Sequence, residues 1–168
     1  MKKVKIKEFN NEELWLGYGD IQQELKKRNL VRTNNITGER GEFLVIETYN
    51  STKALPNLQA SPQSTKNIDA ISRNGERYSI KSITDPSRIT GVFHDMGEKE
   101  DTSVPDKKFE YVVIVQLFNN YRPKLIVELT CEQFLKYRKW HKTMRAWNLS
   151  LTKSLLSEAK IILDNTQG

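Results

Sequence analysis

The stretch from Ser64 to Ile83 alternates between apolar and polar residues on either side of Asn74-Gly75. This alternation around an Asn-Gly pair predicts two short strands joined by a tight turn. A three-residue hairpin loop favours glycine in the left-handed conformation at its last position, and Gly75 has that place in the segment 73–75. We therefore predict a three-residue loop here, or an equivalent bulge.

The length of this loop decides which polar side chains share a face of the sheet. With three loop residues, Asp69 lies opposite Ser79, and Lys81 points the same way because side chains alternate along a strand. With a two-residue turn, Asp69 would lie opposite Ile80 and face away from Lys81. An acid beside a small polar residue and a lysine could hold a divalent metal next to a cation. The alternative is an ordinary cross-strand ion pair between Asp69 and Lys81, which contributes little at a surface.

Helical periodicity predicts two helices before the hairpin, over residues 11–29 and 38–49. The first begins at Asn10 or Asn11 and carries an apolar stripe. The centre of the second is apolar all round, so we expect it to be largely buried. Glu42 lies at the end of one apolar stripe, whereas Glu39 belongs to what we expect to be an exposed first turn. Glu42 either stabilises the helix dipole or binds a positive partner, because a buried unpaired carboxylate is costly.

The pattern after the hairpin predicts two core strands followed by helices. The β-branched run over 110–118 and the segment 124–129 are expected to pair as strands. Thr130 and Gln133 have capping-box spacing, which predicts a cation-rich helix to about residue 147. A last helix is expected over 150–163. Two long loops, 51–66 and 89–106, are the expected irregular segments.

Composition restricts the chemistry. The chain has 168 residues, which suits one domain, and 27 Lys+Arg against 21 Asp+Glu give a net charge of +6. That excess suits a polyanionic partner, or is only a basic surface. The single cysteine, Cys131, excludes a disulfide framework. The only histidines, His94 and His141, lie far apart in sequence, which argues against a His/Cys metal cage. No signal-peptide pattern and no membrane-length apolar run occur, so we expect no membrane and a cytoplasmic location.

Three segments in this order resemble the PD-(D/E)xK, or restriction-endonuclease-like, nuclease superfamily. They are Gly41-Glu42-Phe43-Leu44, residues 67–71 around Asp69, and Arg77-Tyr78-Ser79-Ile80-Lys81. The resemblance covers roughly residues 37–130. It implies an α/β (α+β) fold with a central mixed β-sheet flanked by helices, with extra helices at both ends. One nuclease-like domain over 1–168 is expected, with a helical part over about 131–163.

This resemblance implies a metal-dependent catalytic site. The family has an acid two residues before the lysine, and this chain has Ser79 at that position. Some branches of the family carry serine there and take a carboxylate from the first helix instead. In this chain, Glu42 lies on that helix. The implied catalytic residues are Glu42, Asp69, Ser79 and Lys81. The implied Mg²⁺ ligands, with Mn²⁺ as a substitute, are Asp69, Glu42 and the Ile80 carbonyl. Lys81 would orient or deprotonate the attacking water.

The expected function is a Mg²⁺-dependent endonuclease acting on double-stranded DNA, of the type II restriction or another defence class. Lys66 and Arg88 flank the site, and Lys139 and Lys142 lie on the cation-rich helix, so these four are candidate phosphate contacts. A cutter this small is expected to act as a homodimer. Two alternatives remain: an inactive nuclease-fold module that binds DNA, and a partner-binding protein whose basic helix is only a solvated face.

Overall fold

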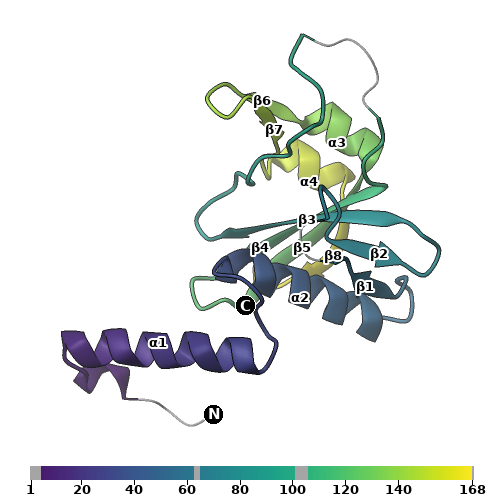
Figure 1. Ribbon diagram of the computed structural model, residues 1–168. Helices are drawn as coiled ribbons and strands as arrows, with labels where there is room; N and C mark the ends of the chain where they lie inside the picture. Colours follow the sequence, from purple (N-terminus) through teal and green to yellow (C-terminus); the bar gives the residue numbers. More distant parts are fainter. Residues whose placement is uncertain (1–4, 63–64, 101–105, 168) are drawn as a thin grey trace.

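The structure is a computed structural model that describes residues 5–62, 65–100 and 106–167 (Figure 1). A mixed sheet with the strand order β1-β2-β3-β4-β5-β8 forms its centre; β3 and β4 are parallel and the other neighbours antiparallel. These strands are β1 (Leu58–Ala60), β2 (Ala70–Ser72), β3 (Arg77–Thr84), β4 (Tyr111–Leu117), β5 (Pro123–Thr130) and β8 (Lys160–Asp164). A separate hairpin consists of β6 (Lys139–His141) and β7 (Ala146–Asn148). The helices are α1 (Asn11–Lys27), α2 (Ile36–Ser51), α3 (Cys131–Tyr137) and α4 (Lys153–Glu158), and a 3-10 turn spans Ile6–Glu8.

Helices cover both faces of the sheet. Helix α2 lies on one face, whereas α3, α4 and the β6–β7 hairpin lie on the other (Figure 1). Alternate residues of β3 enter the two cores. Tyr78 and Ile80 pack with the side chains of α2, and Ile83 packs with Phe93 and Phe134 on the opposite face. The predicted α+β class with a central mixed sheet is therefore confirmed.

The predicted three-residue hairpin loop is also confirmed. Ala70 pairs with Tyr78 and Ile71 with Arg77, so the register leaves residues 73–75 as the loop. Gly75 has a φ angle of +84°, the left-handed conformation that glycine adopts without a steric penalty. The predicted strands over 110–118 and 124–129 are present as β4 and β5.

The predicted helices over 130–147 and 150–163 are wrong in their extent. Helix α3 has the expected capping box of Thr130 and Gln133 but ends at Tyr137. The chain then forms β6 and β7, whose Trp140 and Trp147 rings contact each other with centroids 5.1 Å apart. Pairing of two large aromatics across the strands outweighs the weak helical preference of the cations between them. Helix α4 is likewise short, because the chain continues into β8 at the edge of the sheet.

The long loops are less irregular than expected. Strand β1 lies within 51–66, and within 89–106 Phe93 forms a β-bridge with Trp147. Residues 63–64 and 101–105 of these loops lie outside the described residues.

Gly41 allows α2 to approach the sheet closely. A Cβ atom at Gly41 would lie 1.7 Å from the Oγ of Ser82 on β3, which is sterically impossible without movement. The Ser82 hydroxyl is buried and has no hydrogen-bond partner among the described residues. The neighbouring Glu42 is thereby held close to β3.

Helix α1 begins where one of the two predicted caps places it. The Asn10 side chain accepts a hydrogen bond from the Glu13 amide, and Glu13 completes a capping box. None of the residues of α1 is buried, and the helix projects away from the sheet (Figure 1). Among the described residues, no helix combines the length and the apolar character needed to cross a membrane.

Candidate functional site

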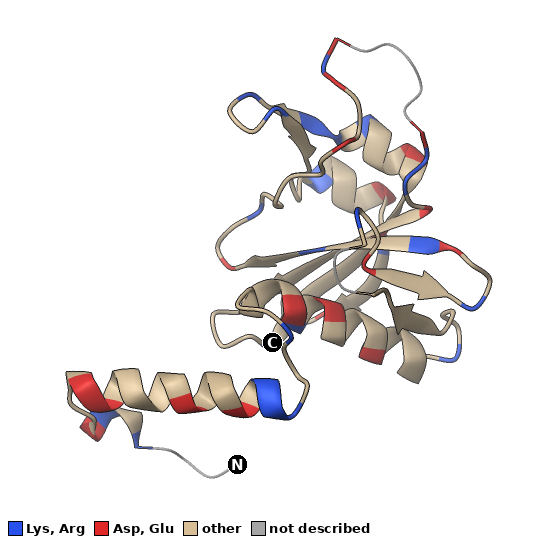
Figure 2. Cartoon of the chain, in the orientation of Figure 1, with Lys and Arg blue, Asp and Glu red and all other residues tan. Residues whose placement is uncertain are grey.

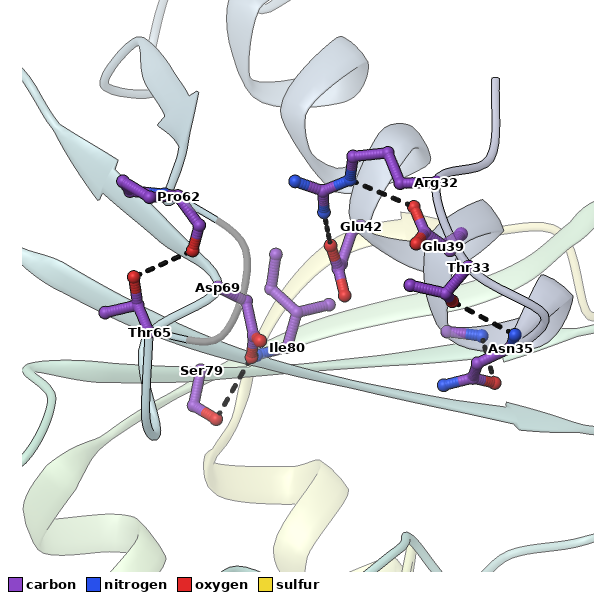
Figure 3. Close-up of polar contacts among 11 residues, drawn as sticks. Arg32, Thr33, Asn35, Glu39, Glu42, Pro62, Thr65, Asp69, Ser79 and Ile80 are labelled. Atoms are coloured by element: carbon purple, nitrogen blue, oxygen red, sulfur yellow. Dashed lines mark hydrogen bonds and ion pairs between the residues drawn. The ribbon is translucent and has the colours of Figure 1, made fainter. Parts of the chain in front are cut away.

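Asp69 lies where strands β2 and β3 separate. The Asp69 amide still donates to the Tyr78 carbonyl, at 2.8 Å, but Asn67 has a φ of +62° and turns the preceding chain away. The Ile80 amide donates instead to Oδ2 of Asp69, at 2.6 Å, and the Ser79 hydroxyl donates to the same oxygen at 3.3 Å (Figure 3). The carboxylate is therefore fixed at the gap between the strands, and the predicted meeting of Asp69 and Ser79 is confirmed.

Glu42 approaches the same gap from helix α2. Its Oε2 accepts a hydrogen bond from the Arg32 guanidinium at 2.7 Å, and the same guanidinium donates to Glu39 at 3.2 Å (Figure 3). Glu39 is only 8% exposed, so the expectation of an exposed first-turn acid there is wrong. Glu39 is instead the second anchor of Arg32. Glu42 retains 22% of its side-chain exposure and faces the space next to Asp69.

A small polar cavity of about 180 Å³ contains both carboxylates. Arg32, Ser61 and Thr65 contribute to its wall. The hydroxyl of Ser61 is buried and lacks a hydrogen-bond partner among the described residues. A buried hydroxyl without a partner is costly, which is typical of a site that a bound group or ordered water completes.

The electrostatics of the cavity favour a cation. The pKa of Glu42 is raised from 4.5 to about 7: burial is the largest cause, the Asp69 charge also raises it, and Arg32 opposes both effects. Two carboxylates that share a low-dielectric space repel each other, which favours the protonated form of Glu42. Arg32 offsets only part of this effect.

The donor set fits a hydrated Mg²⁺. Within the described residues, Oε1 of Glu42 and Oδ1 of Asp69 accept no hydrogen bond, so each carboxylate keeps an oxygen for a ligand. No group of three or more His, Cys, Asp or Glu side chains in the described part of the chain could hold a metal. Two carboxylates, a main-chain carbonyl such as that of Ile80, and several waters match Mg²⁺, which commonly keeps part of its hydration shell.

The last predicted site residue, Lys81, lies on β3 two residues after Ser79. It therefore shares a face of β3 with Ser79, and its ammonium nitrogen lies 5.0 Å from the centre of the Phe93 ring. Its charge still lowers the pKa of Glu42, as the smallest of the contributing effects. Asp69 and Lys81 form no ion pair among the described residues, so the ordinary cross-strand pair is not formed.

The four candidate phosphate contacts have different surroundings. Lys66 is exposed and lies 4.0 Å from Asp95, whereas Arg88 donates from Nε to the Leu151 carbonyl at 2.8 Å and is occupied there. Lys139 and Lys142 are exposed on the β6–β7 hairpin and not on a helix, where they had been predicted. Figure 2 shows cationic residues on this hairpin, on the face of the sheet opposite α2.

Sequence reasoning missed Arg32 and Ser61. Neither belongs to a recognisable motif, because each comes from a loop whose path only the folded structure defines. A lone arginine seven residues before Glu39 and ten before Glu42 would have been the only signal.

Comparisons with known proteins add no family assignment. No protein-family model matches the chain, and no curated protein matches its sequence. The candidate site therefore rests on the residues and geometry described above.

Proposed function

We propose that the protein is a Mg²⁺-dependent endonuclease that hydrolyses phosphodiester bonds in double-stranded DNA. The observation that carries this proposal is the pair of Glu42 and Asp69 carboxylates in one cavity, with the pKa of Glu42 raised to about 7. A perturbed carboxyl pair in a cleft is typical of a functional site. The net charge of +6 adds an electrostatic attraction to a polyanion.

The residues of the cavity have distinct roles in this proposal. Mg²⁺ would polarise the scissile phosphate and lower the pKa of an attacking water. Asp69, oriented by the Ile80 amide and the Ser79 hydroxyl, would be the main ligand. Glu42 would lose its proton as it becomes the second ligand. Lys81 would leave the Phe93 ring to orient the water or stabilise the developing negative charge.

The resemblance to the PD-(D/E)xK nucleases supports the same function. A mixed sheet, an acid at the opening of a hairpin and a glutamate on the preceding helix agree with what the resemblance implies. A type II restriction or other defence enzyme is the class we propose, with Lys66, Lys139 and Lys142 as exposed candidates for phosphate contact. Cutting both strands of a duplex calls for two sites, hence for a dimer.

A second candidate is an inactive DNA-binding module of the same fold. Two observations favour it: Ser79 replaces the family acid, and the ammonium of Lys81 lies over Phe93. Such a module would bind DNA with an affinity that falls as salt rises, because the contacts are to phosphates. It would not cut DNA with Mg²⁺ or Mn²⁺.

Cleavage of mixed duplex DNA with Mg²⁺, Mn²⁺ or EDTA tests the two functions. The wild type and a Glu47→Gln control, exposed on the same helix as Glu42, should cut with metal only. Asp69→Asn keeps an oxygen for the Ile80 amide, so it should fold but lose cleavage, as should Lys81→Ala. Metal-dependent cleavage retained in either variant would reject the assigned site. Salt-dependent binding without cleavage by the wild type would favour the inactive module.

A further inference from the structure

Helix α1 carries an apolar seam that the other described residues leave largely exposed. Leu14, Tyr18, Ile21 and Leu25 follow one another at spacings of four, three and four residues, which is the repeat of a helix that packs along another helix. Leu14 is 41% exposed, Tyr18 47% and Ile21 56%. A helix of this length with two glycines is marginal in water on its own, so the seam needs a packing partner.

A groove runs beside this seam. Tyr18, Ile21 and Leu25 form one wall of an apolar cavity of about 410 Å³. The opposite wall comes from Ile36, Arg40 and Phe43 of α2 and from Tyr121. Phe43 is 38% exposed and Tyr121 is 41% exposed. An apolar groove next to an apolar helix face offers both halves of a self-complementary contact on one chain.

The charges of α1 indicate which occupant fits. Its first turn carries Glu12 and Glu13, and its last turn carries Lys26 and Lys27 (Figure 2). A second copy of the helix in antiparallel orientation sets each acidic end beside a basic end and opposes the two helix dipoles favourably. A parallel copy would set like charges together.

The seam is also symmetric about its middle. A two-fold axis between Gly19 and Asp20 sets Leu14 of one copy against Leu25 of the other, and Tyr18 against Ile21. We propose that α1 is a homodimerisation helix that pairs antiparallel with α1 of a second copy. This proposal does not depend on the nuclease function.

The proposed contact runs along the whole of α1. The 17-residue helix is about 25 Å long. Insertion of a second helix would also fill the groove against Phe43 and Tyr121.

Sedimentation equilibrium of the full chain tests the proposal. The wild type should have twice the monomer mass of 19.6 kDa, and Ile21→Glu should have the monomer mass. Gln23→Glu adds the same residue on the opposite side of the helix and should remain dimeric. Because no residue of α1 is buried, circular dichroism should show the same folded core in all three. A monomeric wild type, or a dimeric Ile21→Glu, would overturn the proposal.

Cysteine cross-linking tests the orientation. A mixture of Leu14→Cys and Leu25→Cys proteins should form an intermolecular disulfide under mild oxidation. Either variant alone should not, because the two cysteines of such a dimer lie at opposite ends of the seam. The wild type serves as the control, since its single cysteine, Cys131, is buried. A cross-link within Leu14→Cys alone would overturn the antiparallel arrangement.

Discussion

Substitution of Glu42 by glutamine should stabilise the fold at neutral to alkaline pH. The pKa of Glu42 is raised from 4.5 to about 7, so the folded protein holds a proton there that the unfolded chain releases above 4.5. The stability contribution of this proton is complete below 4.5 and is lost as the pH rises through about 7. The difference between those pKa values corresponds to about 3 kcal/mol, which sets the upper limit of the gain.

Thermal unfolding near pH 8 and pH 4 measures this effect. Glu42→Gln should melt several degrees higher than the wild type near pH 8, since 1 kcal/mol corresponds to roughly 2–4 °C in a chain of this size. Near pH 4 the two proteins should melt together, and Glu47→Gln should match the wild type at both values.

Added Mg²⁺ gives an independent readout of the same substitution. It should raise the melting temperature of the wild type near pH 8 and leave that of Glu42→Gln almost unchanged, because the variant lacks the second carboxylate ligand. A difference in melting temperature that is the same at both pH values, or a variant less stable near pH 8, would refute a raised pKa of Glu42 in the folded protein.

Three further substitutions have expected outcomes. Gly41→Ala should lower the free energy of unfolding in urea by about 1–3 kcal/mol, because its Cβ atom would overlap Ser82, and Ser82→Ala should restore part of the loss; full stability of the single variant would contradict this close approach. The Arg77 hydrogen bonds lower the pKa of Glu110 to about 2, so its contribution is present above 4.5 and lost as the pH falls through about 2. Glu110→Gln should therefore lower the free energy of unfolding by about 1 kcal/mol near pH 7 and leave it unchanged near pH 2. The figure is small because the Arg77–Glu110 pair is partly exposed. Equal losses at both pH values in urea titrations would argue against a stabilising role for this ion pair. Ser79→Ala should lower the free energy of unfolding by about 1 kcal/mol in the same assay, the usual contribution of one hydrogen bond, because Asp69 still accepts the hydrogen bond from the Ile80 amide. A loss several times larger would mean that Ser79 has stabilising contacts besides the one with Asp69.

The part of the site that local geometry determines could be predicted from sequence. Gly75 specified the hairpin loop, and the loop specified the register that sets Asp69 against Ser79. The helix with Glu42 followed from an apolar run that only a buried helix satisfies. In each case, neighbouring residues carry the signal.

Other features depend on contacts distant in sequence. The end of α3 and the strands β6 and β7 follow from the packing of Trp147 against Phe93 and the aromatic core, which outweighs local helix preference. The pairing of Arg32 with Glu39 and Glu42 depends on the path of a loop. The position of Lys81 over Phe93 depends on a β-bridge that connects residue 93 to residue 147.

The most direct test of the account is the position of a bound divalent cation. A crystal of the full chain soaked in Mn²⁺ and measured for anomalous scattering would locate it. We predict a single strong peak between the carboxylates of Glu42 and Asp69, with Arg32 displaced from Glu42, and no such peak in Asp69→Asn. A Mn²⁺ peak only elsewhere, or none, would contradict the assignment of this cavity as a metal site.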